Sequence, residues 1–204
     1  MKTVIAAALL SLSGACAFAA GPNLVANGSF EVVDGPTNYW LITEKLSGWQ
    51  VNPDIEVQND FEGNFAQDGK YFIELDTFNN STMTQTIHAT GWVELSFWYS
   101  ARANRTGGAT QTLGYSFGAL SGTVLSDAVS GATTQWQHFT GLVDVGKSGS
   151  AELRFAALGP SDQFGGLLDN VSVTAVPEPA SGWLALAGAA VLGGWHRRRR
   201  AAGR

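Results

Sequence analysis

The chain has 204 residues, of which 45% are apolar and only 14% are charged, whereas about 25% are charged in an average globular protein. Its 25 glycines, 6 prolines and 11% aromatic residues exclude a collagen, a coiled coil or a disordered tail protein and favour one folded domain. Between residues 21 and 176, six Lys and Arg stand against sixteen Asp and Glu. That balance argues against a nucleic-acid partner and suits a cation, a neutral glycan or simple solubility.

The N-terminal segment, residues 1–20, has the pattern of a secretory signal peptide. Lys2 supplies a short basic region, an apolar run follows over residues 4–12, and two alanines are spaced as an A-x-A cleavage site. The one cysteine of the chain, Cys16, lies inside this segment. The mature domain is therefore expected to have neither a disulfide nor a thiolate metal site. Lipidation of Cys16 is the alternative interpretation.

Residues 21–175 have the pattern of an all-β domain. Short apolar segments are separated every 8–14 residues by Gly, Asn, Asp and Ser, and no 3.6-residue apolar stripe is long enough for a helix. Eight or nine strands without helices predict a two-sheet antiparallel β-sandwich, most simply a jelly roll. The longest expected loops are 102–110 and 159–165. The expected strands are Trp49–Val51 with Ile55–Gln58, Tyr71–Asp76, Met83–Ile87, Val93–Ala101, Thr112–Phe117, Gly122–Leu125, Gln135–Val143, Ser150–Ala157 and Gly166–Thr174.

The strand expected at 93–101 alternates between apolar and polar side chains, so its two faces can be told apart. One face carries Leu95, Phe97, Tyr99 and Ala101, and the other carries Glu94, Ser96, Trp98, Ser100 and Arg102. Trp98 is therefore a large aromatic side chain on an otherwise polar face.

Aromatic side chains that have no core to fill are candidates for glycan binding. Sugar rings present apolar C–H faces that stack on aromatic rings, and their hydroxyls need amide, carboxylate or guanidinium partners. We expect a carbohydrate-binding surface made of Trp98, Arg102 and Glu94, with Trp40 contributed by a loop at 39–46. The alternative is that this loop covers Trp98, which would then have a purely structural role.

The order of several short motifs resembles the galactose-binding-like jelly rolls. The motifs are NLVANGSFE at 23–31, GW at 48–49, DGKYFIELD at 68–76, TQTI at 84–87, ELSFWYSARA at 94–103, TTQWQHFTGLV at 133–143 and LLDNVSV at 167–173. They are similar to bacterial relatives of the DUF642 family of cell-wall proteins and, more remotely, to family 4/9-type carbohydrate-binding modules. The resemblance implies a jelly roll that binds polysaccharide.

In those modules a structural calcium ion often lies where the first and last strands meet. The resemblance implies that Glu31 and Asp169 supply carboxylate ligands, with oxygens of Asn27 or Ser29 as further donors. Calcium takes six to eight hard oxygen ligands, which suits this set. The alternative is that Asn27-Gly28 forms a turn that Asp169 orders without a metal.

Two patterns could suggest an enzyme, and we expect neither to be catalytic. Gly114–Gly118 fits G-x-S-x-G, with Asp127 and His138 following in the order of an α/β-hydrolase triad, but that motif needs a helix after the turn and none is expected. Glu74 and Asp76 lie on the same side of one strand. Surface solvation or ion binding explains that pair more simply than glycoside hydrolysis.

The C-terminal segment, residues 176–204, joins three features in order: a Pro-Glu-Pro motif, an apolar stretch over 180–195 and an arginine cluster. As a helix the apolar stretch would rise about 24 Å, at the short limit for a bilayer core of about 30 Å, and arginines would hold its end in the cytoplasm. The motif residues are Pro177, Glu178 and Pro179, and the cluster is Arg197, Arg198, Arg199 and Arg200.

This three-part order resembles the PEP-CTERM sorting signal of Gram-negative bacteria. There the membrane protease exosortase is thought to recognise Pro-Glu-Pro, remove the helix and pass the protein outward. An ordinary C-terminal membrane anchor is the alternative.

Together these features predict a secreted, non-catalytic β-sandwich that associates with extracellular or cell-surface polysaccharide. The resemblances imply export across the inner membrane, transient anchoring by the C-terminal helix and processing by exosortase, with structural calcium as the one cofactor considered. The alternative is a structural protein of the surface or biofilm matrix that has protein partners and binds no sugar.

Overall fold

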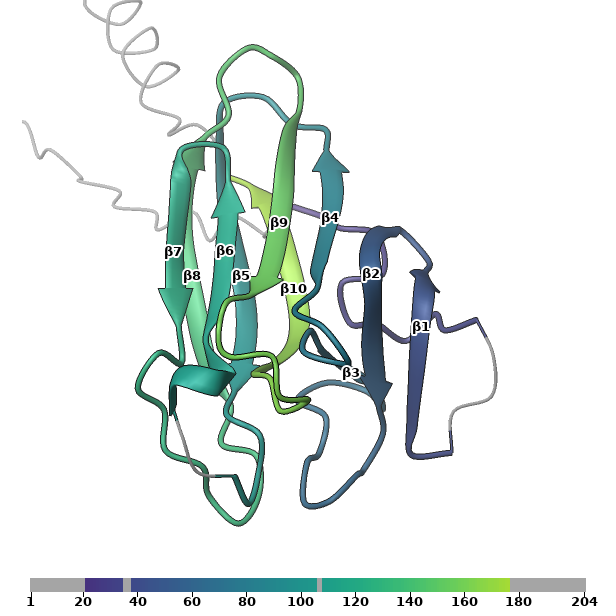
Figure 1. The fold of residues 1–204 in the computed structure, drawn as a ribbon. Helices are drawn as coiled ribbons and strands as arrows, with labels where there is room; N and C mark the ends of the chain where they lie inside the picture. The colour runs from purple at the N-terminus through teal and green to yellow at the C-terminus, as the bar shows by residue number, and fades with distance from the viewer. Residues whose placement is uncertain (1–20, 35–37, 106–107, 177–204) are drawn as a thin grey trace, which may run out of the picture.

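The computed structural model describes residues 21–34, 38–105 and 108–176 (Figure 1). Within these ranges the chain forms strands and one 3-10 turn but no α-helix, so the all-β prediction is confirmed. A helix long and apolar enough to cross a membrane is not found among these residues. The elements are β1 (Trp40–Leu46), β2 (Trp49–Gln58), β3 (Phe72–Glu74), β4 (Thr82–Ile87), β5 (Trp92–Ser100), η1 (Gly108–Gln111), β6 (Leu113–Phe117), β7 (Leu120–Val124), β8 (Gln137–Asp144), β9 (Ala151–Ala157) and β10 (Leu167–Ala175).

The strands form one antiparallel sheet that folds into two layers. Their order is β7-β6-β9-β4-β2-β3-β10-β5-β8, and β1 is added to β2. Strand β2 joins the layers, because residues 50–52 pair with β4 whereas residues 56–58 pair with β3. Figure 1 shows β6 and β9 lying in front of β5 and β10. The predicted two-layer sandwich is thus confirmed.

The core lies between the two layers and is built from alternate positions of each strand. On β5, Leu95 is fully buried and Phe97 is 1% exposed, whereas Trp98, the next residue, is only half-buried. Phe97 meets Phe155 of β9 edge to face across the core, with ring centroids 5.1 Å apart. The expected alternation is confirmed from Val93 to Trp98, and Trp98 points away from the core. It is wrong at the end of the strand, where Ser100 and Arg102, expected on the outer face, are buried.

Residues 40–46 differ from the prediction, because they form strand β1 and not a loop. This strand runs antiparallel to β2, with Thr43 opposite Ile55. Only Leu46 at its end is buried, so the strand lacks the apolar alternation by which the sequence could have shown it. Since β1 lies beside β2 and not beside β5, the idea that this segment covers Trp98 is wrong.

The first and last segments of the described chain lie side by side. The N–H of Leu24 donates to the carbonyl of Val173 at 2.8 Å, and the N–H of Val171 donates to the carbonyl of Gly28 at 2.8 Å. A Cβ at Gly28 would lie 2.0 Å from the Val171 carbonyl oxygen, so only glycine fits there. The motifs NGSFE and LDNVSV are therefore two halves of one contact.

Candidate functional site

A cavity of about 340 Å³ lies at one end of the sandwich. It forms where the loops after β2, β3 and β5 and the loop before β10 meet beside β1. The two loops expected at 102–110 and 159–165 both contribute to it. Its lining residues are Trp40, Ile42, Glu56, Phe61, Glu62, Thr77, Phe78, Arg102, Arg105, Gln163 and Phe164.

Aromatic rings make up much of the cavity wall. Trp40 is 51% exposed and Phe78 is 66% exposed, so both rings have surface that is open to solvent and not packed in the core. Phe164 lies beneath both guanidinium groups, with the Cζ atom of Arg105 3.8 Å and that of Arg102 5.4 Å from its ring centroid. The wall thus combines free apolar ring faces with charged groups that cation–π contact holds in place.

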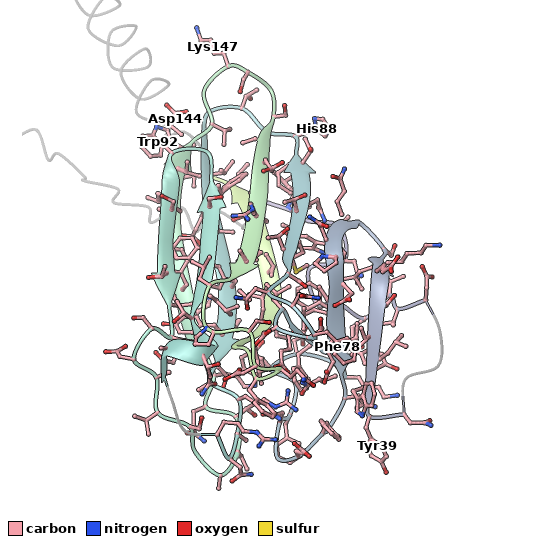
Figure 2. All side chains as sticks on the ribbon, in the orientation of Figure 1. Tyr39, Phe78, His88, Trp92, Asp144 and Lys147 are labelled. Atoms are coloured by element: carbon pink, nitrogen blue, oxygen red, sulfur yellow. The ribbon has the colours of Figure 1, made fainter. Side chains whose placement is uncertain are left out.

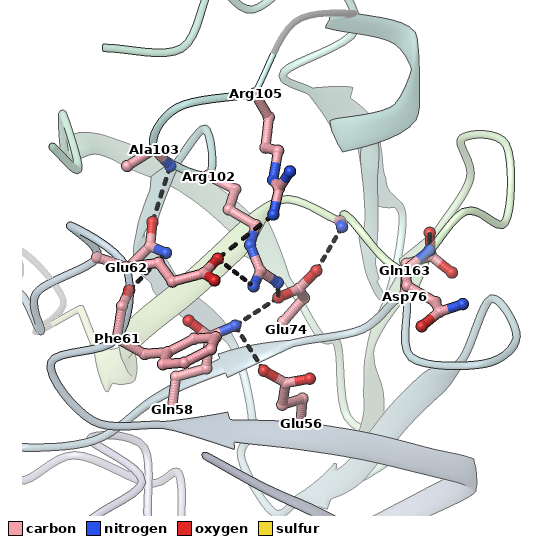
Figure 3. A network of polar contacts seen from close by, with 12 residues as sticks. Glu56, Gln58, Phe61, Glu62, Glu74, Asp76, Arg102, Ala103, Arg105 and Gln163 are labelled. Atoms are coloured by element: carbon pink, nitrogen blue, oxygen red, sulfur yellow. Dashed lines mark hydrogen bonds and ion pairs between the residues drawn. The ribbon is translucent and has the colours of Figure 1, made fainter. Parts of the chain in front are cut away.

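A buried ion pair between Arg102 and Glu74 lies beside the cavity (Figure 3). Arg102 is 4% exposed and donates from Nη1 to Glu74 Oε2, an oxygen that also accepts from the Gln58 amide. The other oxygen accepts the N–H of Gly165. A Cβ at Gly165 would lie 3.0 Å from Asp76, so glycine permits this close approach. Burial raises the pKa of Glu74, and the Arg102 guanidinium opposes that rise.

Glu74 and Asp76 are both buried, so the expectation that this pair is solvated at the surface is wrong. Asp76 Oδ2 accepts the N–H groups of Asp162 and Gln163 at 2.9 and 3.1 Å. These bonds fix the loop before β10. The two carboxylates therefore hold the loops that shape the cavity, and no substrate is needed to explain them.

The remaining charged groups of the cavity are also paired. Glu62 Oε2 lies 3.6 Å from Nη2 of Arg102 and 3.3 Å from Nη2 of Arg105. Glu56 accepts the Gln58 amide at 2.9 Å, and burial raises the pKa of Glu56. Among the described residues, however, the buried Nε of Arg102 has no hydrogen-bond partner. This nitrogen is itself buried, so it is not available to a molecule bound in the cavity.

The carbohydrate-binding surface expected from the sequence is split in two by the structure. Trp40 and Arg102 line the cavity, whereas Trp98 and Glu94 are not among its lining residues. Trp98 lies on the outer face of β5 and stacks on His138 of β8, with ring centroids 4.6 Å apart and planes 21° apart. Arg102 follows the end of β5 and turns into the cavity, so it does not share a face with Trp98.

Glu31 and Asp169, the expected calcium carboxylates, both bind the segment between β2 and β3. Glu31 Oε1 accepts the N–H groups of residues 70 and 71 at 2.7 and 2.8 Å. Asp169 Oδ2 accepts those of residues 67 and 68 at 2.8 and 3.0 Å. Asp169 is fully buried, and burial raises the pKa of Asp169 to about 7 although these N–H donors oppose the rise.

Asn27 and Ser29, the other expected calcium ligands, lie in the turn before Glu31. The Asn27 side chain closes that turn by accepting the Val32 N–H at 2.9 Å and donating to its carbonyl at 3.0 Å, and Ser29 is half-buried. One carboxylate oxygen of Glu31 and both of Asp169 thus already accept backbone N–H groups.

Across the described ranges, no group of three or more His, Cys, Asp or Glu side chains could hold a metal. Calcium stays a prediction. Thermal unfolding in calcium and in EDTA tests it, because an ion bound to the native state raises Tm. An unchanged Tm would mean that these oxygens bind only their N–H donors.

The G-x-S-x-G pattern at 114–118 falls within β6 and its last turn. Ser116 pairs with Ser121 of β7 on one side and with Arg154 of β9 on the other. A nucleophile elbow needs a sharp turn from a strand into a helix, and the segment that follows is strand β7. The hydrolase interpretation therefore lacks its geometry.

Most of the cavity was missed at the level of the sequence. Phe61, Phe78 and Phe164 each lie in a segment rich in Gly, Asn and Asp, outside any alternating strand. An aromatic side chain outside any alternating strand is the same signal that marks Trp40, and it also marks these three loops.

Solved structures with a similar fold exist at low sequence identity. The Stig cyclase Fisc from Fischerella sp. TAU is 14% identical, with a TM-score of 0.55 over 79% of this chain and 100% of its own. TmCBM61 in complex with β-1,4-galactotriose is 19% identical, with a TM-score of 0.48 over 75% of this chain and 98% of its own. A family 16 carbohydrate-binding module is 13% identical, with a TM-score of 0.49 over 74% and 99%. At this identity the likeness concerns the fold alone.

The end of the chain matches a family model. Residues 175–200 match the PEP-CTERM protein-sorting motif, whereas no curated protein matches the chain. Pro177–Pro179, the expected C-terminal helix and Arg197–Arg200 fall inside this match and outside the described residues. The expected signal peptide at 1–20 also lies outside the described residues. The chain thus carries a PEP-CTERM sorting motif directly after a two-layer antiparallel β-sandwich.

Proposed function

We propose that the protein is exported, processed at its sorting motif by exosortase, and associates with polysaccharide outside the cell through the cavity, without catalysing a reaction. The observation that carries this proposal is the composition of the cavity wall, which sets four aromatic rings among guanidinium, carboxylate and amide groups. Aromatic faces stack on the C–H faces of sugars, and the polar groups bind their hydroxyls.

The geometry suggests a role for each group. Trp40 and Phe78 supply exposed ring faces for stacking, and the half-exposed carboxylate of Glu62 can accept a hydroxyl hydrogen. Both arginines of the cavity already have carboxylate partners, and an acidic sugar would have to displace Glu62 from Arg105. The proposed ligand is therefore a neutral glycan.

The test is retention of the purified protein on immobilised neutral and acidic exopolysaccharides. An aromatic contact is worth about 0.5–1.5 kcal/mol, so Trp40→Ala and Phe78→Ala should each weaken retention about two- to tenfold. Trp92→Ala is the matched control, because Trp92 is 55% exposed against 51% for Trp40 and lies at the opposite end of the sandwich. Retention of the wild type on no polysaccharide would favour the matrix protein with protein partners.

Trp98 and Glu94 remain a proposed second contact on the outer face of β5. A half-buried indole that stacks on His138 leaves part of its surface open. A glycan chain bound there would have to follow the outer face of the sheet, and the Trp98→Ala variant described below tests this.

The proposed processing has its own test. Mass spectrometry of the extracellular protein should find the C-terminus near Pro177–Pro179 in cells that have exosortase. An extracellular product that still carries Arg197–Arg200 would contradict processing and leave the glycan proposal standing.

A further inference from the structure

The end of the sandwich opposite the cavity exposes apolar side chains. Trp92 begins β5 and is 55% exposed, whereas Arg102 in the cavity follows the end of the same strand. Nine residues of strand separate the two ends by about 30 Å. Figure 2 shows Trp92 at one end and Phe78 at the other.

Three exposed apolar side chains come together there. Leu142 is 57% exposed, and its register opposite Glu94 puts it on the same face of the sheet as Trp92, one pair further along. Val176 is 37% exposed and donates its N–H to the Trp92 carbonyl at 3.0 Å. We call Trp92, Leu142 and Val176 the apolar end surface.

The charged groups around this surface lie both in the neighbouring loops and on the strands themselves. The two loops at this end, residues 88–91 and 145–150, contain one histidine and one lysine, and the remaining residues are Gly, Ala, Ser, Thr and Val. Two carboxylates lie within the surface, because Asp144 is directly opposite Trp92 and Glu94 is directly opposite Leu142. The surface therefore suits the lipid–water interface, where these carboxylates can stay hydrated, and not the hydrocarbon core.

Both ends of the described chain leave the sandwich at this same end. Val176 is followed by only three residues before the apolar stretch 180–195 begins. Four steps of extended chain span at most about 14 Å. Gly21, where the domain begins, lies beside the last strand, since a Cβ built on it would be 3.9 Å from the Ala175 nitrogen. A tail inserted in a bilayer would therefore hold the apolar end surface close to the lipid.

We propose that the apolar end surface contacts the lipid bilayer while the protein is anchored by its C-terminal segment. The proposal rests on the proposed sorting function, because it needs residues 180–195 in the membrane. Tryptophan is favoured at the interface between hydrocarbon and water. The cavity then points away from the membrane and is open to glycan before the tail is removed.

The experiment places the chain from Gly21 onward, with its tail, in lipid nanodiscs. The one native cysteine, Cys16, precedes this chain, so Leu142→Cys and Val129→Cys each give a single attachment point for a fluorophore. Val129 is 90% exposed and lies in the loop before β8, at the cavity end. Nitroxide-labelled lipid should quench the fluorophore at position 142 several-fold more than the one at position 129.

A second substitution tests whether the surface itself makes the contact. Added to Leu142→Cys, Trp92→Ser should reduce the quenching, whereas Trp40→Ala should leave it unchanged. Equally weak quenching at both positions would mean that the tail or a protein partner covers the surface, and would overturn the proposal. Glycan retention measured on the same nanodiscs reports on glycan binding and not on lipid contact, so the failure of either proposal can be recognised by itself.

Discussion

The two ends of the sandwich are made from the same strands but are held by different forces. At the cavity end, buried charge holds the loops: Arg102 pairs with Glu74, and Asp76 binds the loop before β10. At the opposite end the loops are short turns in which Gly91 and Gly146 have positive φ, and the N–H of Gly91 donates to the carbonyl of Gly146. The strands that the two ends share therefore do not determine the chemical character of either end. The side chains of the loops determine it.

The largest expected effect comes from breaking the buried ion pair. Arg102→Met leaves Glu74 without its guanidinium partner in a fully buried place, which should cost about 3–5 kcal/mol in the free energy of unfolding at pH 7. Urea denaturation measures this. The loss should shrink as the pH falls, since Glu74 then takes up a proton. Arg154→Met, an exposed control on β9, should change stability by less than about 0.5 kcal/mol.

The next effect is the dependence of stability on pH. Burial raises the pKa of Asp169 from 3.8 to about 7, so the folded protein holds a proton that the unfolded chain releases. The free energy of unfolding should therefore fall as the pH rises from about 4 to about 7, and this contribution is fully present only below that window. Chemical denaturation across the window should show a flatter profile for Asp169→Asn. Identical profiles would contradict the assignment.

Trp98 and Trp49 offer a smaller contrast, which tests whether binding extends beyond the cavity. Trp49 is 7% exposed and packs on Phe30 and Phe155, so Trp49→Ala should cost about 3–5 kcal/mol. Because Trp98 is half-buried, Trp98→Ala should reduce the free energy of unfolding much less and should keep Tm within a few degrees. If its outer face binds glycan, retention falls as well. Unchanged retention would confine binding to the cavity.

The smallest effects on stability are expected at the two exposed tryptophans. Trp40→Ala and Trp92→Ala should each change the free energy of unfolding by about 0.5 kcal/mol or less, because about half of each side chain is already in water. Their functional effects should be opposite, with glycan retention sensitive to Trp40 and lipid contact sensitive to Trp92. A single substitution that impaired both glycan retention and lipid contact would contradict the assignment of these two functions to opposite ends.

Local pattern was enough to predict every strand that has one buried face. The expected limits of β5, β9 and β10 agree with the structure to within one residue at each end, because alternation reports directly on which side meets the core. The two loops that form much of the cavity were also expected, from their Gly, Ser and Asn content. Strand β1 was missed because it is an edge strand with few buried positions and therefore shows no alternation.

The position of Arg102 could be decided only by the tertiary structure. Alternation put its side chain on the face of Trp98, but β5 ends at Ser100 and the guanidinium pairs with Glu74, which lies 28 positions earlier in the chain. The burial of Glu74 and Asp76 depends in the same way on loops that are distant in sequence. The apolar periodicity of a strand shows which of its side chains face the core. A cavity forms where several loops that are distant in sequence come together, so the periodicity of any one strand cannot predict it.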